Sequence, residues 1–556
     1  MVAALPDAPD RDAASVTHHS RFLEVPPFPG CRFRQFERLP EGGEREVSLH
    51  ECLALLRKHR VGGTYWARQP ELPPSYLLLR SAATVGTCDH LIEQHGDLLL
   101  WLAAPAPAPS TVTTIIGECD PWHMLASARS LVCDADDDLR LIAAILDVPT
   151  YLVDPCGGPP QQWEGDVEDL LADALPVAAS FSNPFGDDAL DLIALIELAG
   201  FWRSLIDANR MISSGVGFAF WKQDSVLPLL WGGSGAGEFF SRSAAEQTQG
   251  AVAIWRSKAP RDVVDQLESR GTTLVEVEDG FLRSAGLGAD CVPPLSITVD
   301  CLGPYFDPKQ PSELENLLES GCFTEPLVAR ARKLRETIVA AGLGKYDRSD
   351  AVVARFHATK RHVLVAGQVE DDLSILTGGA GLASNLELLQ LVRAREPDCF
   401  LIYKPHPDVV AGHRKGHIHE PIARQSADMV ITDASISSLI AMVDEVHVNT
   451  SLAGFEALMR HKDVTTYGVP FYAGWGLTRD LGPVPGRRTS KRSLDELVAA
   501  TLLLYPRYLD PVTGLPCPAE VVVERLCAGA ASRTGLLVSA RRIQGKLKRR
   551  LSWFAR

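Results

Sequence analysis

From about Gly215 to Gly468 the chain alternates apolar, strand-like runs with helical patterns of roughly ten residues. Strands that alternate with helices predict parallel, doubly wound sheets, and this alternation constrains the fold more than any other feature. The expected strands are 215–221, 251–255, 272–279, 362–368, 399–408, 444–451 and 463–468, and the expected helices are 259–270, 312–320, 328–342, 385–395 and 452–462.

The strand at 272–279 ends in a group of charged residues. It delivers Glu278 and Asp279 to a turn at Gly280, and Arg283 and Ser284 follow shortly after. Open parallel sheets bind ligands at the carboxyl ends of their strands. We therefore expect a ligand site at this strand end.

A second motif, KPHPD at 404–408, stands at the end of the expected strand 399–408. Prolines restrict the backbone there, so His406 can point into a cleft and donate to phosphate, with Lys404 beside it. The alternative is a structural histidine. The lysine and the two prolines around His406 favour phosphate binding.

The third motif, TSLAGFEAL at 450–458, opens the expected helix 452–462. Thr450 and Ser451 stand where an N-cap and a first turn are expected, and free N–H groups and hydroxyls there bind phosphate. Gly454 would allow a ligand to approach closely, and Glu456, one turn further, would bind ribose hydroxyls. An ordinary capped helix is the alternative.

Composition describes a soluble globular protein of 556 residues with 46% hydrophobic and 22% charged residues. A net charge of −15 argues against a nucleic-acid partner. The twelve cysteines show no metal-like spacing, so we expect reduced thiols and a cytoplasmic protein. The N-terminus lacks the pattern of a signal peptide, and no apolar run is long enough to span a membrane.

The first 200 residues resemble a decayed copy of the second half of the chain. Gln69 matches Gln368, Trp122 matches Ser437, and 168–171 matches 495–498, so the offset between matching positions rises along the chain, as duplication with small deletions produces. The alternative is that two doubly wound domains share a common alternation of strands and helices.

The two copies differ at the positions of the phosphate-binding motifs. Ala104 and Ala106 stand where the second half has Lys404 and His406, and Asp136 stands opposite Ser451. Loss of phosphate-binding groups, with a negative charge in the place of one of them, predicts a structural role for the first copy.

Three segments imitate binding motifs. CDADDD at 133–138 has the form of a metal-binding DxD but falls in the decayed copy, and we interpret it as a solvated acidic loop. GGSGAG at 232–237 and GGAGLAS at 378–384 lack the strand and helix that a phosphate loop joins directly, and we interpret them as surface or lid loops. No metal and no cofactor are predicted.

Taken together, the motifs resemble those of bacterial capsule β-Kdo transferases, which move 3-deoxy-manno-octulosonic acid (Kdo) from CMP-Kdo onto a glycan. The resemblance covers about residues 215–515, and its motifs occur in the family's order: EDGFLRS at 278–284, GQVEDDLSI at 367–375, KPHPD, TSLAGFEAL, YGVPFYAGWGLT at 467–478 and PRYLDPVTG at 506–514. His461 departs from the family's usual glycine. The chain also resembles one intact module with the rear part of another, so a dual activity is not inferred.

The resemblance implies a retaining reaction with Asp279 as the nucleophile, because two inversions require a carboxylate at the anomeric carbon. Glu278 is the weaker candidate, since neighbouring side chains on a strand face opposite ways. Arg283 would pair with the Kdo carboxylate or with the departing phosphate. Further candidates for sugar or acceptor binding are Ser284, Gln368, Glu370, Asp371 and Asp372.

The expected architecture is α/β, with two Rossmann-like doubly wound domains in a GT-B arrangement preceded by a degenerate α/β domain. The expected parts are a disordered N-terminus (1–20), the degenerate domain (21–205), a Rossmann-like domain with the nucleophile motif (206–345), a CMP-binding Rossmann-like domain (346–480), closing helices (481–538) and a tail (539–556).

The tail SARRIQGKLKRRLSWFAR contains seven Lys or Arg and no acidic residue, and its apolar residues recur at helical spacing. A basic amphipathic helix of this kind suits the anionic inner membrane surface, and a solvated tail is the alternative. We therefore expect a cytoplasmic, peripheral membrane transferase that acts on a glycan or glycolipid acceptor. The alternatives are a noncatalytic polysaccharide-assembly scaffold and a transferase for another CMP-nonulosonic acid.

Overall fold

A computed structural model describes residues 22–39, 47–81, 91, 97–107, 112–175, 179–233, 239–282, 292–344, 353–412 and 414–529. The chain forms two compact units. Unit 1 falls within Met1–Pro26 and Gln35–Ser204, and unit 2 falls within Pro27–Arg34 and Leu205–Arg556. The expected disordered N-terminus (1–20) and the basic tail (539–556) lie outside the described residues.

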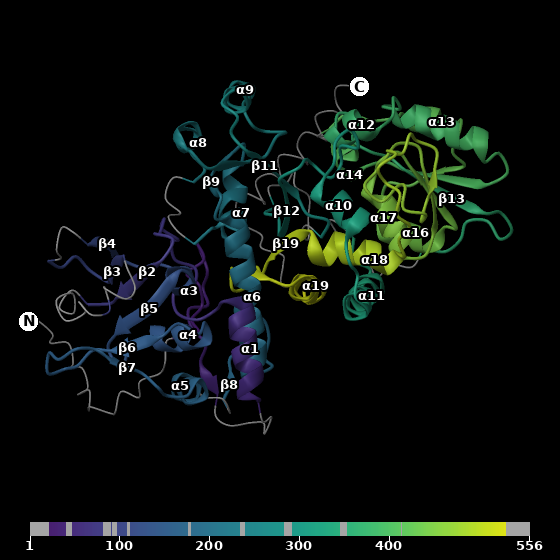
Figure 1. The fold of residues 1–556 in the computed structure, drawn as a ribbon. Helices are drawn as coiled ribbons and strands as arrows, with labels where there is room; N and C mark the ends of the chain where they lie inside the picture. Colours follow the sequence, from purple (N-terminus) through teal and green to yellow (C-terminus); the bar gives the residue numbers. More distant parts are fainter. Residues whose placement is uncertain are drawn as a thin grey trace, which may run out of the picture. The chain divides into compact units, whose positions relative to one another are not determined.

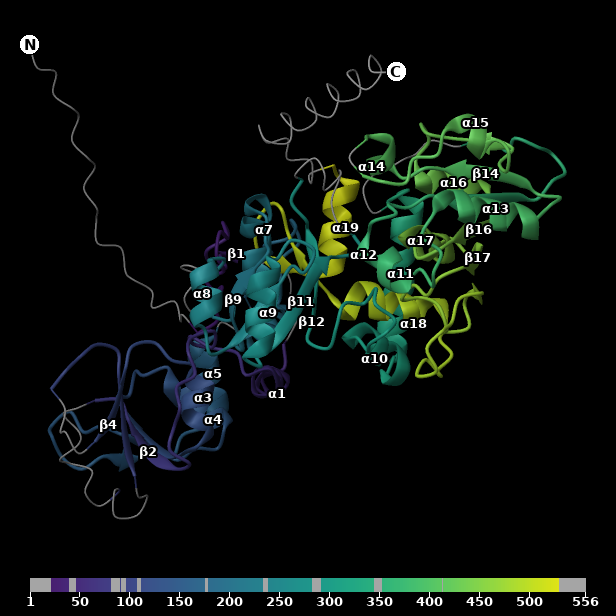
Figure 2. The ribbon, with the colours of Figure 1, turned by 90° about the horizontal axis from the view of Figure 1, so that it is seen from above.

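Unit 2 contains two six-stranded sheets: in Figure 1 the first combines teal strands with two yellow strands from residues 506–517, and the second runs from green to yellow. The first sheet has the order β20-β19-β12-β11-β10-β9. Its strands are β9 (Ile212–Val216), β10 (Ala251–Ile254), β11 (Leu274–Asp279), β12 (Ser296–Asp300), β19 (Pro506–Leu509) and β20 (Pro516–Cys517). Helices α7 (Phe220–Leu230), α8 (Arg242–Gln247) and α9 (Arg261–Ser269) lie beside this sheet in Figure 2.

The predicted α/β class is confirmed, but the first sheet is not wholly parallel. Strands β9, β10 and β11 are parallel, whereas β12 is antiparallel to β11 and β19 is antiparallel to β12. All the residues of β12 are buried. A strand that is buried on both faces shows no alternation, so its sequence does not indicate its direction.

Residues 481–538 were predicted to be closing helices, and this is only partly right. Helix α18 (Leu494–Val498), the π-helix η3 (Ala499–Leu504) and α19 (Ala519–Cys527) are present, but β19 and β20 lie between them. Strand β19 joins the first sheet because Leu509 packs into the core that the strands share with α7. Pro27–Arg34 also belongs to unit 2, although 21–205 was assigned to one domain, because the Arg32 N–H donates to the Thr513 carbonyl at 2.7 Å.

The second sheet of unit 2 has the order β15-β14-β13-β16-β17-β18, and all its strand pairs are parallel, as predicted. The strands are β13 (His362–Ala366), β14 (Phe400–Lys404), β15 (Met429–Val430), β16 (Glu445–Val448), β17 (Asp463–Thr466) and β18 (Arg479–Asp480). Helix α13 (Asn385–Arg395) buries Leu388, Leu389 and Val392 against β13 and β14. Other helices of this half are α10 (Glu313–Ser320), α11 (Glu325–Ala340), α12 (Leu373–Gly378), α14 (Pro407–Val410), α15 (Glu420–Ala423), α16 (Ile436–Met442) and α17 (Leu452–Met459).

Two expected strands are shorter than predicted. The run 215–221 leaves the strand after Val216, and the aromatic residues that suggested a strand begin α7. Gly217 makes this turn with φ of +86°, and a Cβ there would lie 2.5 Å from the Trp255 carbonyl oxygen. The run 399–408 ends as a strand at Lys404, and Pro407 opens α14. In both cases a local turn overrides β-propensity.

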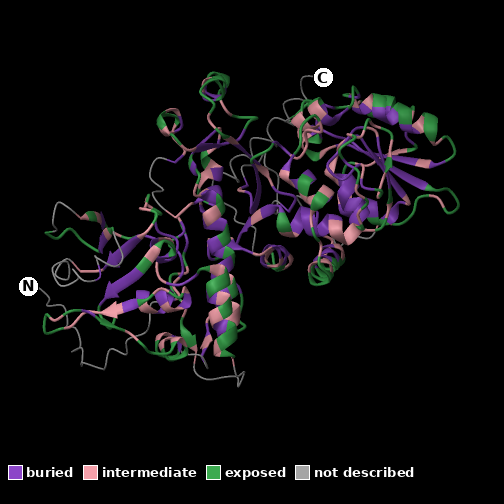
Figure 3. Ribbon diagram, in the orientation of Figure 1, coloured by how far each residue is buried: buried purple, intermediate pink, exposed green. Residues whose placement is uncertain are grey.

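Unit 1 has a third six-stranded sheet, with the order β4-β3-β2-β5-β6-β7. Its strands are β2 (Tyr76–Leu79), β3 (Leu98–Leu102), β4 (Thr113–Ile116), β5 (Ala128–Cys133), β6 (Thr150–Leu152) and β7 (Gln161–Gln162). Strands β1 (Arg38–Leu39) and β8 (Ser180–Phe181) form a separate pair. The unit's helices include α1 (Leu49–His59), α3 (Pro121–Ala126), α4 (Leu139–Ile145), α5 (Val167–Ala174) and the first part of α6 (Leu192–Asn209). Figure 3 shows the central strands of all three sheets as buried.

The sheet of unit 1 and the second sheet of unit 2 have the same strand order when β2–β7 are matched with β13–β18. Helix α3 begins at Pro121 and α16 at Ile436, while α5 begins at Val167 and α18 at Leu494, which are the offsets that the sequence repeat predicts. One difference is that β7 is antiparallel to β6, whereas β18 is parallel to β17. Many doubly wound sheets share this strand order, so it is the matching helix offsets that favour a duplication.

None of the described helices combines the length and the apolar character that crossing a bilayer requires.

Candidate active site

A cleft of about 890 Å³ lies within unit 2 and is lined by residues that follow strands of both its sheets. The first sheet contributes the loop after β9 and the end of β11, and the second contributes the ends of β13 and β14 and the starts of α16 and α17. This volume suits a small-molecule ligand. Phe281, two residues after the end of β11, contacts Phe471 with ring centroids 4.8 Å apart, and Phe471 also lines the cleft.

Asp279 and Glu278 are the last two residues of β11, and both line the cleft. Asp279 Oδ1 accepts from Lys222 Nζ at 3.1 Å. The expectation that neighbouring strand residues face opposite ways does not separate them, because the cleft lies across the end of the strand and not along one face. Desolvation, and then the charge of Asp279, raises the pKa of Glu278.

Lys222 was missed by the sequence analysis. It lies in the first turn of α7, and its Nζ is 3.3 Å from the centroid of the Trp255 ring as well as close to Asp279. The signal was available in the run GVGFAFWK, where the glycines mark a turn before a helix. Interpreting that run as a strand placed the lysine outside the site.

On the opposite wall, Lys404 and His406 both line the cleft at the end of β14. Lys404 is buried and donates to the Thr432 carbonyl at 2.6 Å. His406 is the N-cap of α14, and its Nδ1 accepts from the Asp408 N–H at 3.1 Å. A neutral imidazole whose Nδ1 accepts carries its proton on Nε2, so His406 can present Nε2–H as a donor.

Ser451 is the N-cap of α17, and Thr450 directly precedes it. The Ser451 hydroxyl accepts from the Ala453 N–H at 3.2 Å and keeps its own proton to donate. Glu456, one turn along, is buried and lines the cleft. The helix start therefore places the hydroxyl-bearing residues Thr450 and Ser451 at the cleft, and hydroxyls at a helix start are suited to binding phosphate.

The role predicted for Gly454 is wrong. A Cβ at this position would lie 2.2 Å from the Tyr472 hydroxyl, and Gly454 is not among the residues that line the cleft. The Tyr472 hydroxyl donates to the Ser451 carbonyl at 2.5 Å. The glycine therefore makes room for a tyrosine that supports the helix start, and not for a ligand.

Only two of the four polar candidates that follow β13 line the cleft. Gln368 and Asp372 line the cleft, whereas Glu370 and Asp371 do not. The Glu370 carboxylate accepts from the Asn385 N–H at 2.8 Å, and Asp371 pairs with Arg414 at 3.1 Å on the surface. Asp372 is the N-cap of α12. Arg283 and Ser284 lie outside the described residues.

A group of potential metal ligands lies away from the cleft and consists of Glu396, Glu445 and His447. Arg361 pairs with both glutamates, and His447 Nε2 is 2.9 Å from Glu445 Oε1. A guanidinium between the two carboxylates offsets part of their charge, so these residues form an ion-pair network.

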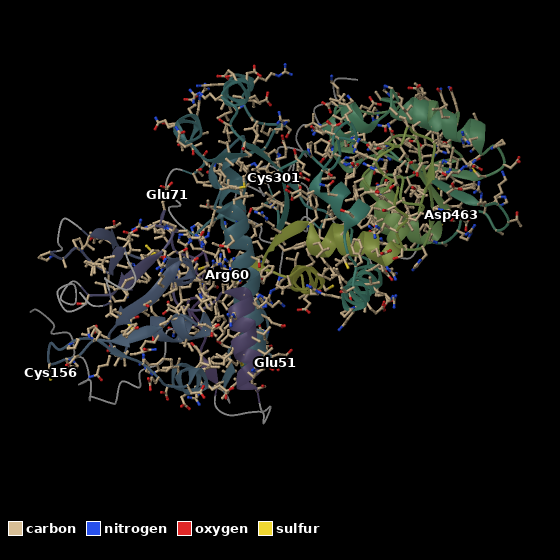
Figure 4. The ribbon with its side chains drawn as sticks, in the orientation of Figure 1. Glu51, Arg60, Glu71, Cys156, Cys301 and Asp463 are labelled. Carbon is tan, nitrogen blue, oxygen red and sulfur yellow. The ribbon has the colours of Figure 1, made fainter. Side chains whose placement is uncertain are left out.

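In unit 1, the N-cap of α3 is Asp120, which matches Ser435 at the start of α16. Asp120 pairs with Arg203 at 2.8 Å, and both side chains are buried. Arg203 also donates to the carbonyl of Arg60, which Figure 4 labels. Gln69, the counterpart of Gln368, donates to Asp120 at 2.7 Å. An internal ion pair thus occupies the place where unit 2 presents a helix start to its cleft.

Residues 250–357 and 343–508 match the family model described as capsule polysaccharide biosynthesis protein. The chain is 37% identical over 361 residues to the capsule polysaccharide modification protein LipA of Neisseria meningitidis serogroup A, covering 64% of this chain and 51% of LipA. It is 45% identical over 283 residues to the lipopolysaccharide-processing protein LpsZ of Rhizobium meliloti, covering 50% of this chain and 64% of LpsZ. The chain thus spans about half the length of LipA.

Among solved structures, the chain is similar to two from Thermosulfurimonas dismutans. They are KpsC, beta Kdo 2,7 transferase (33% identity, TM-score 0.46, covering 57% of this chain and 99% of that one) and KpsC, beta Kdo 2,4 transferase (33% identity, TM-score 0.48, covering 57% and 98%).

Proposed function

This chain belongs to the capsule polysaccharide biosynthesis protein family, and we propose that it is a retaining glycosyltransferase that moves Kdo from CMP-β-Kdo to a capsule-type glycan. The observation that carries the proposal is the pair Asp279–Lys222, which shares one cleft with the start of α17, where we propose that phosphate binds. A carboxylate nucleophile and a nucleotide site on opposite walls are what a double displacement requires.

In the first step, an Asp279 oxygen attacks the anomeric carbon, the bond from that carbon to the phosphate oxygen breaks, and the electron pair leaves with CMP. His406 and the start of α17 bind the phosphate and stabilise its departing charge. In the second step, an acceptor hydroxyl attacks the same carbon, Asp279 leaves as a carboxylate, and Glu278 takes the hydroxyl proton. Once ionised, Glu278 suits this role, because desolvation and the charge of Asp279 raise its pKa and so make its carboxylate a stronger base than an ordinary glutamate.

We further propose that residues 539–556 attach the protein to the cytoplasmic face of the inner membrane, where a lipid-linked acceptor would be found. Their seven basic residues support this proposal.

The test combines CMP-Kdo generated in situ with a synthetic lipid-linked glycan acceptor, and identifies the product by mass spectrometry and NMR. We expect a β-linked product, no product with Asp279→Ala, and a Kdo adduct of the wild-type protein on the peptide that holds Asp279. Calorimetry with CMP serves as the folding control for the variant. Wild-type transfer activity in a folded Asp279→Ala protein would show that Asp279 is not the nucleophile.

Transfer only from another CMP-nonulosonic acid would identify a different donor. CMP binding without any transfer would favour a noncatalytic scaffold.

A further inference from the structure

The position of Lys222 destabilises its positive charge in two ways. Its side chain is only 10% exposed, and it lies in the first turn of α7, where the helix dipole repels cations. Two contacts offset these costs: the carboxylate of Asp279 at 3.1 Å and the π-face of Trp255 at 3.3 Å. A residue that breaks local rules and is compensated at a cleft is typical of a functional site.

The exposures of the Lys222 and Asp279 side chains indicate which of the two contacts the ligand. The Asp279 side chain is 27% exposed and that of Lys222 is 10% exposed, and both residues line the cleft. The carboxylate is therefore the more accessible member, and the ammonium lies behind it against Trp255. The contact uses Oδ1 of Asp279.

The proposed donor makes a cation necessary at this point. In a 2-keto sugar acid, the anomeric carbon itself carries a carboxylate. An ionised aspartate that attacks this carbon brings two negative charges within a few bond lengths of each other, and their repulsion opposes the attack. A cation beside the attacking carboxylate removes much of this repulsion.

We propose that Lys222 is the positioning residue that holds Asp279 for attack and neutralises it against the carboxylate of the sugar acid. This inference rests on the proposed function. In the free enzyme, Lys222 pairs with Asp279. When the bond between an Asp279 oxygen and the anomeric carbon forms and CMP leaves with the electron pair, Asp279 becomes a neutral ester, and Lys222 pairs with the sugar carboxylate. When the acceptor oxygen displaces Asp279, the carboxylate returns to Lys222.

The test measures two quantities for each variant: the rate at which the Kdo adduct forms on the Asp279 peptide without acceptor, and the affinity for CMP by calorimetry. Lys222→Met keeps the length of the side chain without its charge. We expect it to slow adduct formation about 100-fold and to leave CMP affinity close to that of the wild type. Lys222→Arg restores the charge and should recover part of the lost rate, which a purely structural role would not predict.

Lys258 supplies a matched control, because it lines the same cleft and is exposed. Lys258→Met removes one positive charge from the cleft without touching Asp279, so we expect adduct formation to continue near the wild-type rate. If Lys258→Met and Lys222→Met slowed adduct formation equally, only the overall electrostatic potential of the cleft would matter. This result would overturn the positioning role of Lys222.

The outcomes separate the two proposals. A wild-type protein that forms no adduct on Asp279 from CMP-Kdo would overturn the proposed function and the role of Lys222 with it. A wild-type adduct together with an undiminished rate in Lys222→Met would overturn the role of Lys222 alone. An arginine variant that binds CMP but is no faster than the methionine variant would also overturn it.

Discussion

Gln368 holds Thr450 through both atoms of its amide: its Oε1 accepts from the Thr450 N–H at 2.9 Å, and its Nε2 donates to the Thr450 hydroxyl at 3.0 Å. Gln368 follows β13, and Thr450 follows β16, the adjacent strand. This double contact fixes the residue that precedes the Ser451 helix cap. Of the polar residues that follow β13, Gln368 therefore supports the proposed nucleotide site by holding Thr450 in place.

Gln368→Ala should weaken CMP binding by about 1–2 kcal/mol, because it leaves the Thr450 N–H without its acceptor and loosens the helix start. Calorimetry with CMP measures the effect. Gln390→Ala is the control, since Gln390 is exposed on α13 and lies outside the cleft lining. Equal CMP affinity in Gln368→Ala and wild type would contradict the prediction.

His406→Ala and Ser451→Ala should each weaken CMP binding by about 1.5–3 kcal/mol, because each removes a contact to a charged phosphate. Ala106→Ser and Asp136→Asn, at the matching positions of unit 1, should leave the affinity unchanged. Calorimetry should give one CMP per chain. A second site, or a site retained in both His406→Ala and Ser451→Ala, would show that the nucleotide binds elsewhere.

Stability should fall as pH rises through the range in which Glu278 ionises. Its pKa is raised in the folded protein by desolvation, by Asp279 and by Asp372 and Glu276, and is lowered by Lys222. The folded state therefore binds this proton more tightly than the unfolded state does. The resulting loss of stability begins near the ordinary pKa of 4.5 and is complete above the raised value.

Glu278→Gln removes this ionisation, so its free energy of unfolding should decline less between pH 5 and pH 9 than that of the wild type. Denaturant titrations at a series of pH values measure both slopes. The same decline in both proteins would mean that Glu278 does not control this dependence.

Asp120→Ala should destabilise unit 1 by about 3–5 kcal/mol, because it leaves the buried Arg203 without its counter-ion. Asp147→Asn at the exposed Arg57–Asp147 pair is the matched control, and it should cost less than about 1 kcal/mol. Denaturant unfolding measures both changes. CMP affinity should stay at the wild-type value in each variant, and a large loss of CMP binding in Asp120→Ala would contradict a structural role for unit 1.

Deleting residues 539–556 should release the protein from anionic vesicles, since each basic residue near such a surface contributes about 1 kcal/mol. Transfer to a membrane-embedded acceptor should fall, while transfer to a soluble acceptor analogue should persist. Co-sedimentation at rising salt is the accompanying measurement, because screening weakens this attachment. A truncated protein that still sediments with vesicles at low salt would place the anchor elsewhere.

Local sequence patterns determined much of the fold and one side of the site. The apolar run that ends in Glu278 and Asp279 is a strand, and Ser451 begins a helix, because strand alternation and helix capping depend on residues close together in the chain. The repeat offsets also anticipated matching helix starts in unit 1 and unit 2.

Only the tertiary structure decided how distant residues meet. Lys222 reaches Asp279 across 57 positions because β10 lies between β9, which leads into α7, and β11. Gln368 reaches Thr450 across 82 positions because β13 and β16 are neighbours, and packing against Tyr472 alone explains Gly454. The antiparallel β12 and the return of β19 to the first sheet likewise depend on strand pairing. Pairing between buried strands is fixed by the packing of the whole unit, so no local pattern of residues records it.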